Sequence, residues 1–94
     1  MYITVIFDKR SSKYENDIFE FNKLFVKATL KYLIDRYKAI GYLYMNTLYE
    51  QLGLKWNACD ENKCWVYNRD GELKIDISED EKSDKIWIDI TNEL

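Results

Sequence analysis

The chain contains no histidine, no proline, three glycines and two cysteines in 94 residues. Without histidine, a Ser-His-Asp or Cys-His catalytic unit and any histidine-ligated metal site are excluded. No stretch approaches the roughly 18 consecutive apolar residues that a membrane span needs. The apolar start of the chain runs into Asp8-Lys9-Arg10, with none of the features of a secretory signal. These absences predict a cytoplasmic protein that binds no cofactor and is not an enzyme.

Apolar residues make up 47% of the chain and aromatic residues 16%, so low-complexity disorder is excluded. A chain of this length is expected to form a single domain, 1–94, around one small core. The formal net charge of −3 is unevenly spread, because residues 1–47 carry +3 and residues 48–94 carry −6. The acidic half is either an ordinary solvated surface or a surface that meets a basic partner.

Residue periodicity predicts the elements of the first half. Alternating β-branched and aromatic residues predict a strand over 1–7. Polar residues that recur every three or four positions predict a helix over 17–40, which ends at Gly41. Nearly all its other residues are apolar, so we expect this helix to be buried on more than one side.

The second half predicts one short helix and three strands. Asn46 is placed to cap a helix over 47–52, and Asn68-Arg-Asp-Gly71 is typical of a tight hairpin turn. Strands are predicted over 63–67, 73–77 and 86–90. The fold class is therefore α+β, with one long central helix and one short helix packed on a small antiparallel sheet of three to four strands, in the order β-α-α-β-β-β. The sequence does not show which strand pairs with the first one.

Trp87 is the residue that we most expect to contact a partner. It alternates out of phase with Ile86, Ile88 and Ile90, so it faces outward if these isoleucines face the helix. Tyr and Trp are preferred anchors of protein interfaces. The predicted binding residues are Trp87, Asp89, Asp76, Glu79, Asp80, Glu81, Asp84 and Trp56. The alternative is that these carboxylates solvate the surface and protect sheet edges, while the aromatic residues belong to the core.

The two cysteines, Cys59 and Cys64, allow three interpretations. They are reduced thiols in a reducing cytosol, which we expect, or they close a loop as a disulfide. As a metal pair they would need Asp60, Glu61 or Asp84 to complete the coordination sphere. An enzyme that uses carboxylates and a divalent metal is a further hypothesis, but the sequence has no calcium-binding loop and no glycine-rich phosphate loop.

The order of elements over 41–77 is also that of a winged helix-turn-helix. A row of lysines at 23, 27 and 31, together with Arg69, could follow a phosphate backbone. Residues 55–62 are too short and too acidic to form a recognition helix. A degenerate winged-helix module that binds nucleic acid is therefore an alternative function.

Residues 41–53, Gly-Tyr-Leu-Tyr-Met-Asn-Thr-Leu-Tyr-Glu-Gln-Leu-Gly, resemble a block in small uncharacterised proteins of bacteriophages and Gram-positive hosts. In those proteins an Asp/Asn-Lys-x-x-Trp stretch and an Asp-Gly hairpin follow, which correspond here to residues 60–65 and Asp70-Gly71. The resemblance covers residues 24–77 and departs at Cys64, where a glycine is expected. It implies a phage or mobile-element origin and brings no catalytic residues with it.

We therefore expect a small non-enzymatic phage or mobile-element protein that binds and occupies a surface of a host or viral protein. The partner is expected to be a protein with a basic surface, rather than a nucleic acid or a membrane, and the chain to be a monomer or a homodimer. The finer expectation is an inhibitor of a bacterial defence nuclease, such as an anti-CRISPR protein. A virion or self-assembling component that pairs edge strands, at 85–91 or at the first strand, is the other alternative.

Overall fold

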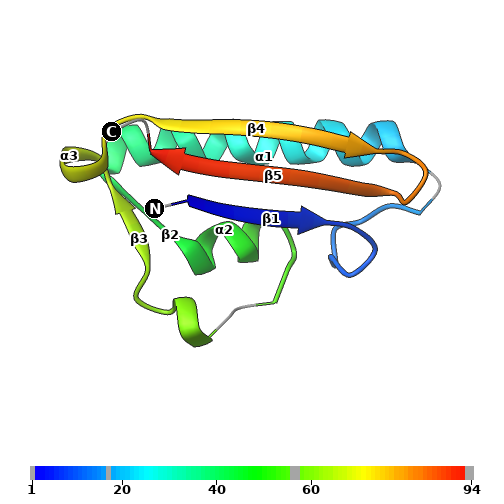
Figure 1. Ribbon diagram of the computed structural model, residues 1–94, viewed down its shortest axis with the longest axis horizontal. Coiled ribbons are helices and arrows are strands. Elements are labelled where there is room, and N and C mark those ends of the chain that lie inside the picture. Colours follow the sequence, from blue (N-terminus) through cyan, green and yellow to red (C-terminus); the bar gives the residue numbers. More distant parts are fainter. Residues whose placement is uncertain (1, 17, 56–57, 93–94) are drawn as a thin grey trace.

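A computed structural model describes residues 2–16, 18–55 and 58–92, and it confirms the predicted α+β fold. A long helix lies behind a three-stranded antiparallel sheet, and a two-stranded sheet with a short helix lies beside them (Figure 1). The elements are β1 (Tyr2–Phe7), α1 (Phe19–Ile40), β2 (Tyr42–Tyr44), α2 (Met45–Gln51), a 3-10 turn at Ala58–Asp60, β3 (Cys64–Val66), α3 (Tyr67–Asp70), β4 (Leu73–Asp80) and β5 (Lys85–Asn92).

The last strand, β5, is the centre of the larger sheet, whose order is β1-β5-β4. Both neighbours are antiparallel to it, with Val5 and Ile77 opposite Ile88 on either side. One face of this sheet packs on α1 and forms the core with the buried side chains of Val5, Phe7, Ile86, Ile88 and Ile90. Since β5 has a strand on each side, residues 85–91 are not available for edge pairing.

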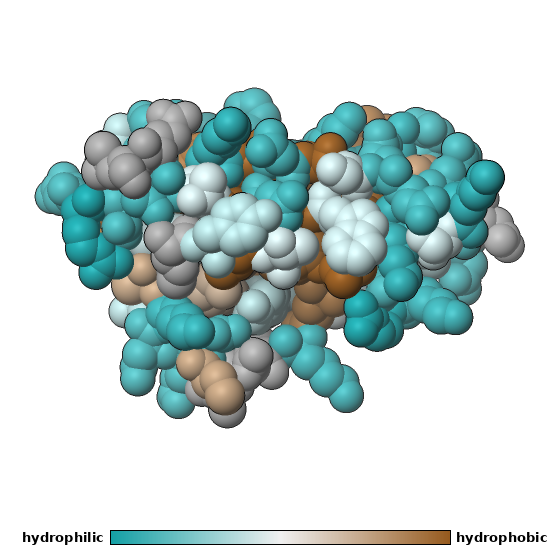
Figure 2. Space-filling model, viewed as in Figure 1, coloured by the Kyte–Doolittle hydropathy of each residue, from teal (hydrophilic) through white to brown (hydrophobic). Residues whose placement is uncertain are grey.

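The other face of the larger sheet points away from α1 (Figure 1). Figure 2 shows this side of the molecule, where pale and brown atoms gather along the middle and teal atoms surround them. Apolar side chains therefore reach solvent on this side, beside polar ones.

Helix α1 buries a single stripe, formed by Asn22, Val26, Leu30, Leu33 and Tyr37. The expectation that it is buried on more than one side is wrong. Phe21, Leu24 and Tyr32 are 48%, 67% and 52% exposed, because the described elements pack against only one side of the helix. A wide apolar arc predicted burial, but a chain this short supplies one layer to cover it.

Gly41 ends α1 as predicted. Its φ angle of 94° lies in the left-handed region, and its N–H donates to the carbonyl of Tyr37 over 2.8 Å. Helices commonly end on such a residue, and glycine adopts the conformation without steric cost.

Gly41→Ala should lower the free energy of unfolding by about 1 kcal/mol, because alanine is strained at a positive φ angle. A Cβ atom here would meet no atom within 4 Å, so the cost is conformational rather than steric. Gly41→Asn is the control, since asparagine tolerates this conformation and should cost less. Urea unfolding followed by circular dichroism measures both variants, and equal losses would show that the backbone angle is not the cause.

Two predicted features of the second half are wrong. Asn46 does not cap α2, which begins one residue earlier, at Met45, with no side-chain cap bond, and Asn46 is buried in its first turn. The segment Asn68–Gly71 is not a hairpin turn, because residues 67–70 form α3 and β3 pairs with β2 instead of β4.

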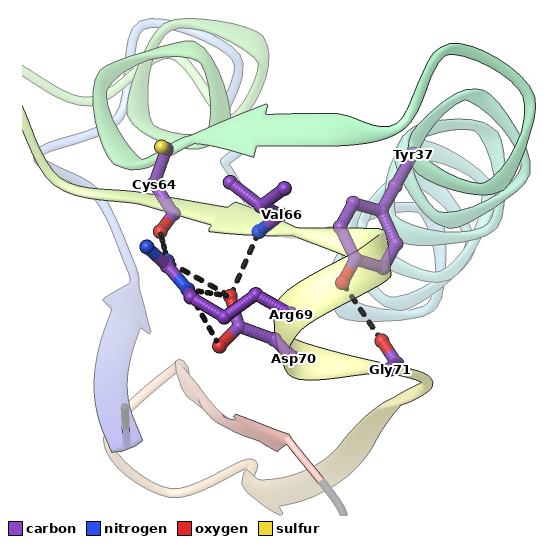
Figure 3. Close-up of polar contacts among 6 residues, drawn as sticks. All are labelled: Tyr37, Cys64, Val66, Arg69, Asp70 and Gly71. Atoms are coloured by element: carbon purple, nitrogen blue, oxygen red, sulfur yellow. Dashed lines mark hydrogen bonds and ion pairs between the residues drawn. The ribbon is translucent and has the colours of Figure 1, made fainter.

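Side-chain bonds explain why α3 replaces the hairpin turn (Figure 3). The Asp70 carboxylate accepts the N–H of Val66 over 2.8 Å and binds the Arg69 guanidinium, which also donates to the carbonyl of Cys64. The Tyr37 hydroxyl donates to the carbonyl of Gly71 over 2.7 Å and joins the start of β4 to α1. Short polar side chains that bind nearby backbone in this way compete with strand pairing.

Candidate protein-binding surface

The register of the larger sheet brings three of the predicted binding residues onto one face. Asp76 of β4 lies directly opposite Asp89 of β5, and Trp87 lies two residues before Asp89 on the same strand. We define the outer face by the outward positions at which the three strands lie side by side, which leaves out Asp80 and Lys85 beyond the end of β1. These positions are Tyr2, Thr4, Ile6, Lys74, Asp76, Ser78, Trp87, Asp89 and Thr91.

Trp87 is the largest side chain at the middle of the outer face. It is 37% exposed, whereas Ile86 and Ile88 on either side of it are buried against α1. The alternation of side chains along β5 thus turns Trp87 outward, as the sequence predicted. Ile6 lies opposite it on β1 and Ser78 on β4, so the indole has an apolar neighbour on one side and a small polar one on the other.

The two carboxylates of Asp76 and Asp89 stand side by side in the sheet. Like charges placed directly opposite each other on neighbouring strands repel. The Thr4 hydroxyl donates to Asp89 over 2.6 Å and holds that carboxylate in place. Two neighbouring carboxylates, one of them held by Thr4, are suited to accept a guanidinium or ammonium group from a partner.

The remaining predicted residues do not all join this face. Glu79 occupies an inward register position, and its carboxylate pairs with the Lys23 ammonium of α1 over 3.0 Å. Asp80 shares the outward register and lies opposite Lys85, while Glu81 and Asp84 lie in the turn between β4 and β5. Trp56 lies outside the described residues.

The contribution of β1 to the outer face was not predicted. Tyr2, Thr4 and Ile6 reach this surface only because β1 pairs with β5, at the other end of the chain. The available signal was that these residues alternate out of phase with the buried Val5 and Phe7. Strand alternation identifies the face of a residue but not the strand beside it, so the position of Thr4 against Asp89 needed the structure.

A hollow of about 610 Å³ lies along the outer edge of β1. Its described lining comes from Thr4, Val5, Ile6, Arg10, Tyr49, Leu54 and Lys55. The guanidinium of Arg10 is bound to the carboxylate of Asp8. Burial raises the pKa of the Asp8 carboxyl, but the hydrogen bonds from Arg10 lower it by more. The pKa of Asp8 therefore lies below its usual value. None of these lining residues carries a carboxylate or a thiol, so the hollow offers no general acid or base of that kind.

The cysteine thiols of the described residues belong neither to a disulfide nor to a metal site. Cys59 and Cys64 are both thiols rather than a disulfide. No group of three or more Cys, Asp or Glu side chains within residues 2–16, 18–55 and 58–92 could hold a metal ion. As a metal pair, the interpretation that was not favoured, the two cysteines therefore have no third ligand in this part of the chain.

The cationic residues considered for nucleic acid are largely engaged within the chain. Lys23 pairs with Glu20 and Glu79, and Lys31 pairs with Asp35 over 3.0 Å. Arg69 is bound to Asp70. Between α2 and β3, where a winged-helix protein has its recognition helix, the described residues form only the 3-10 turn at 58–60. This geometry does not favour the nucleic-acid alternative.

None of the helices described here is both long enough and apolar enough to cross a membrane.

Comparisons with protein-family models, with curated proteins and with solved structures found no match to this chain. The resemblance to phage and Gram-positive proteins therefore stays a prediction.

Proposed function

We propose that this chain is a small non-enzymatic binding protein of a phage or mobile element, which uses its outer face to occupy a basic surface of a host or viral protein. The observation that supports this most is the outward position of Trp87 beside the facing carboxylates of Asp76 and Asp89. An exposed indole next to fixed negative charge matches the composition of interface anchors and the chemistry of a basic partner.

The outer face is suited to binding because its side chains project from a hydrogen-bonded sheet. Groups held by strands lose little freedom when they bind, so less of the interaction energy is spent on ordering them. Contact with a partner removes the exposed part of Trp87 and of Tyr2 from water. A partner lysine or arginine placed between Asp76 and Asp89 also relieves the repulsion between these two carboxylates.

More specifically, we propose that the partner is a bacterial defence nuclease and that the chain is its inhibitor, of the anti-CRISPR kind. Nucleases carry basic grooves that attract phosphates, and a face with ordered carboxylates competes for the same charges. The acidic half of the chain, at −6 over residues 48–94, supports this choice of partner.

Trp87→Ala should abolish capture of a partner when the immobilised chain is incubated with a lysate of the bacterial host. Loss of a central Trp anchor typically weakens binding by about 2 kcal/mol or more, which is about thirtyfold. Tyr32→Ala is the matched control, because Tyr32 is an exposed aromatic residue on α1, away from the outer face. Bound proteins are identified by mass spectrometry; equal capture by both variants, or no capture at all, contradicts the proposal.

Charge is tested separately with Asp76→Asn/Asp89→Asn, against Glu50→Gln/Glu61→Gln as a control with the same change of net charge. Only the first pair should weaken capture, and raising the salt concentration should weaken capture by the unaltered chain.

The inhibitor form predicts that the purified chain slows plasmid cleavage by an RNA-guided nuclease and that Trp87→Ala does not. Capture without inhibition of any nuclease in such a panel would reject the inhibitor form and keep the binding function.

A further inference from the structure

The larger sheet has two edges, and they differ in what lies beside them. Along β1, Tyr49, Leu54 and Lys55 line the hollow beside the strand, so another part of the chain lies next to this edge. Along β4, no strand within the described residues pairs with the edge that faces away from β5. A strand of eight residues with an unpaired edge can pair with another chain.

An apolar groove of about 330 Å³ runs between this edge and α1. Its apolar lining is Leu30, Ile34, Leu73, Ile75 and Ile77, and its charged lining is Lys27, Lys31 and Asp35. The three β4 residues are only half buried, whereas Ile90 and Ile88 of β5, which lie opposite Ile75 and Ile77, are buried completely. The core of the molecule is therefore open along the β4 edge.

We propose that a second copy of this chain pairs with β4 in the antiparallel direction, around a two-fold axis at Ile75, and closes this groove. The sequence of the strand is complementary to itself about this residue. On the inner side, Leu73 faces Ile77 of the second copy; on the outer side, Lys74 faces Asp76 of the second copy. Each contact occurs twice, as a two-fold interface requires.

Neighbouring registers lack this complementarity. Centring the axis on Asp76 opposes two Asp76 carboxylates, and centring it on Ile77 places Ile75 against the charged Glu79 of the second copy. In the Ile75 register, the ammonium of Lys74 also approaches the carboxylate pair of Asp76 and Asp89, whose charges repel each other in the single chain. Charge and apolar pattern thus favour one register.

Charged residues of α1 form the rim of the groove. Lys27 and Asp35 lie at equal distances along α1 from Lys31, so antiparallel helices would bring Lys27 of one copy toward Asp35 of the other. The dimer would join two outer faces into one surface on a continuous six-stranded sheet. The inference does not depend on the proposed function, because its tests use the chain alone.

The first test is a charge swap followed by sedimentation equilibrium at low salt. The unaltered chain should show twice its mass of 11.4 kDa. Lys74→Glu and Asp76→Lys should each weaken the dimer about tenfold, because each creates two like-charge pairs, and the double variant should restore it. Both side chains are exposed, so circular dichroism should show an unchanged fold. A monomeric unaltered chain, or a double variant as weak as the single ones, would overturn the proposal.

The second test is cross-linking in a Cys59→Ser/Cys64→Ser background. Ile75→Cys should form a disulfide-linked dimer under mild oxidation, because residues on the axis face their own copy at a Cα separation of about 5 Å. Ile77→Cys is the matched control on the same side of the same strand, and it should link poorly. Equal cross-linking of both variants would reject the register.

Discussion

Trp65→Ala is expected to lower the free energy of unfolding by about 3–5 kcal/mol, the usual cost of emptying a buried aromatic site. Trp65 is 0% exposed and lies on β3 opposite Leu43 of β2, within the core cluster. Its ring connects the two-stranded sheet to the rest of the core. Since small domains have a total stability of about 5–15 kcal/mol, this single change brings the chain close to unfolding.

Trp87→Ala is the matched control, since it removes the same side chain from the outer face. We expect a cost of about 1–2 kcal/mol, because part of this indole packs on neighbouring strands. Urea unfolding followed by circular dichroism gives both values. If the two tryptophans cost the same, Trp87 is a core residue, and the outer face loses the anchor on which the proposed function depends.

Strand alternation predicted the faces of the larger sheet correctly but not its order. Ile75 and Ile77 on β4 and Ile86, Ile88 and Ile90 on β5 face α1, as their period of two indicated. The pairing of β1 with β5 joins residues at opposite ends of the chain, for example Thr4 and Asp89. The choice between such pairings depends on the whole core, which no local pattern contains.

Local patterns failed where one side chain decided between two turns. The sequence Asp70-Gly71 suits a hairpin, but Asp70 instead binds the N–H of Val66 and closes a helical turn. For the candidate site, alternation placed Trp87, Asp76 and Asp89 outward, and the structure brings them together. Glu79 was grouped with them by its charge and its neighbours in sequence, yet its register turns it toward Lys23.

Asp70→Ala is expected to lower the free energy of unfolding by about 2 kcal/mol at neutral pH. The variant leaves the N–H of Val66 without its acceptor and the Arg69 guanidinium without its carboxylate, so α3 loses the bonds that hold it. Asp70→Asn should cost about 1 kcal/mol, because an amide oxygen still accepts the N–H but carries no charge. The difference between the two variants separates the hydrogen bond from the ion pair.

The pH dependence of this contribution follows from the pKa of Asp70. Hydrogen bonds from Arg69, and then from the N–H of Val66, hold this pKa below the unfolded value of 3.8. A carboxyl with a lowered pKa stabilises the fold fully above its unfolded pKa and loses that contribution as the pH falls through its folded pKa. The stability difference between the unaltered chain and Asp70→Asn should therefore be constant near neutral pH and shrink below pH 3.8.

Comparing the two chains at each pH isolates Asp70, because the other carboxyls with lowered pKa values, Asp8, Asp60 and Glu72, are present in both and cancel. Arg69→Gln is the complementary variant: without the guanidinium, the pKa of Asp70 rises toward its unfolded value, so the loss is smaller and is complete at a higher pH. A stability difference that stays constant from neutral pH to below pH 3.8 would mean that Asp70 titrates in the folded chain as it does in the unfolded one. In that case other bonds would hold α3, among them the Tyr37 bond to Gly71 and the Arg69 bond to the carbonyl of Cys64.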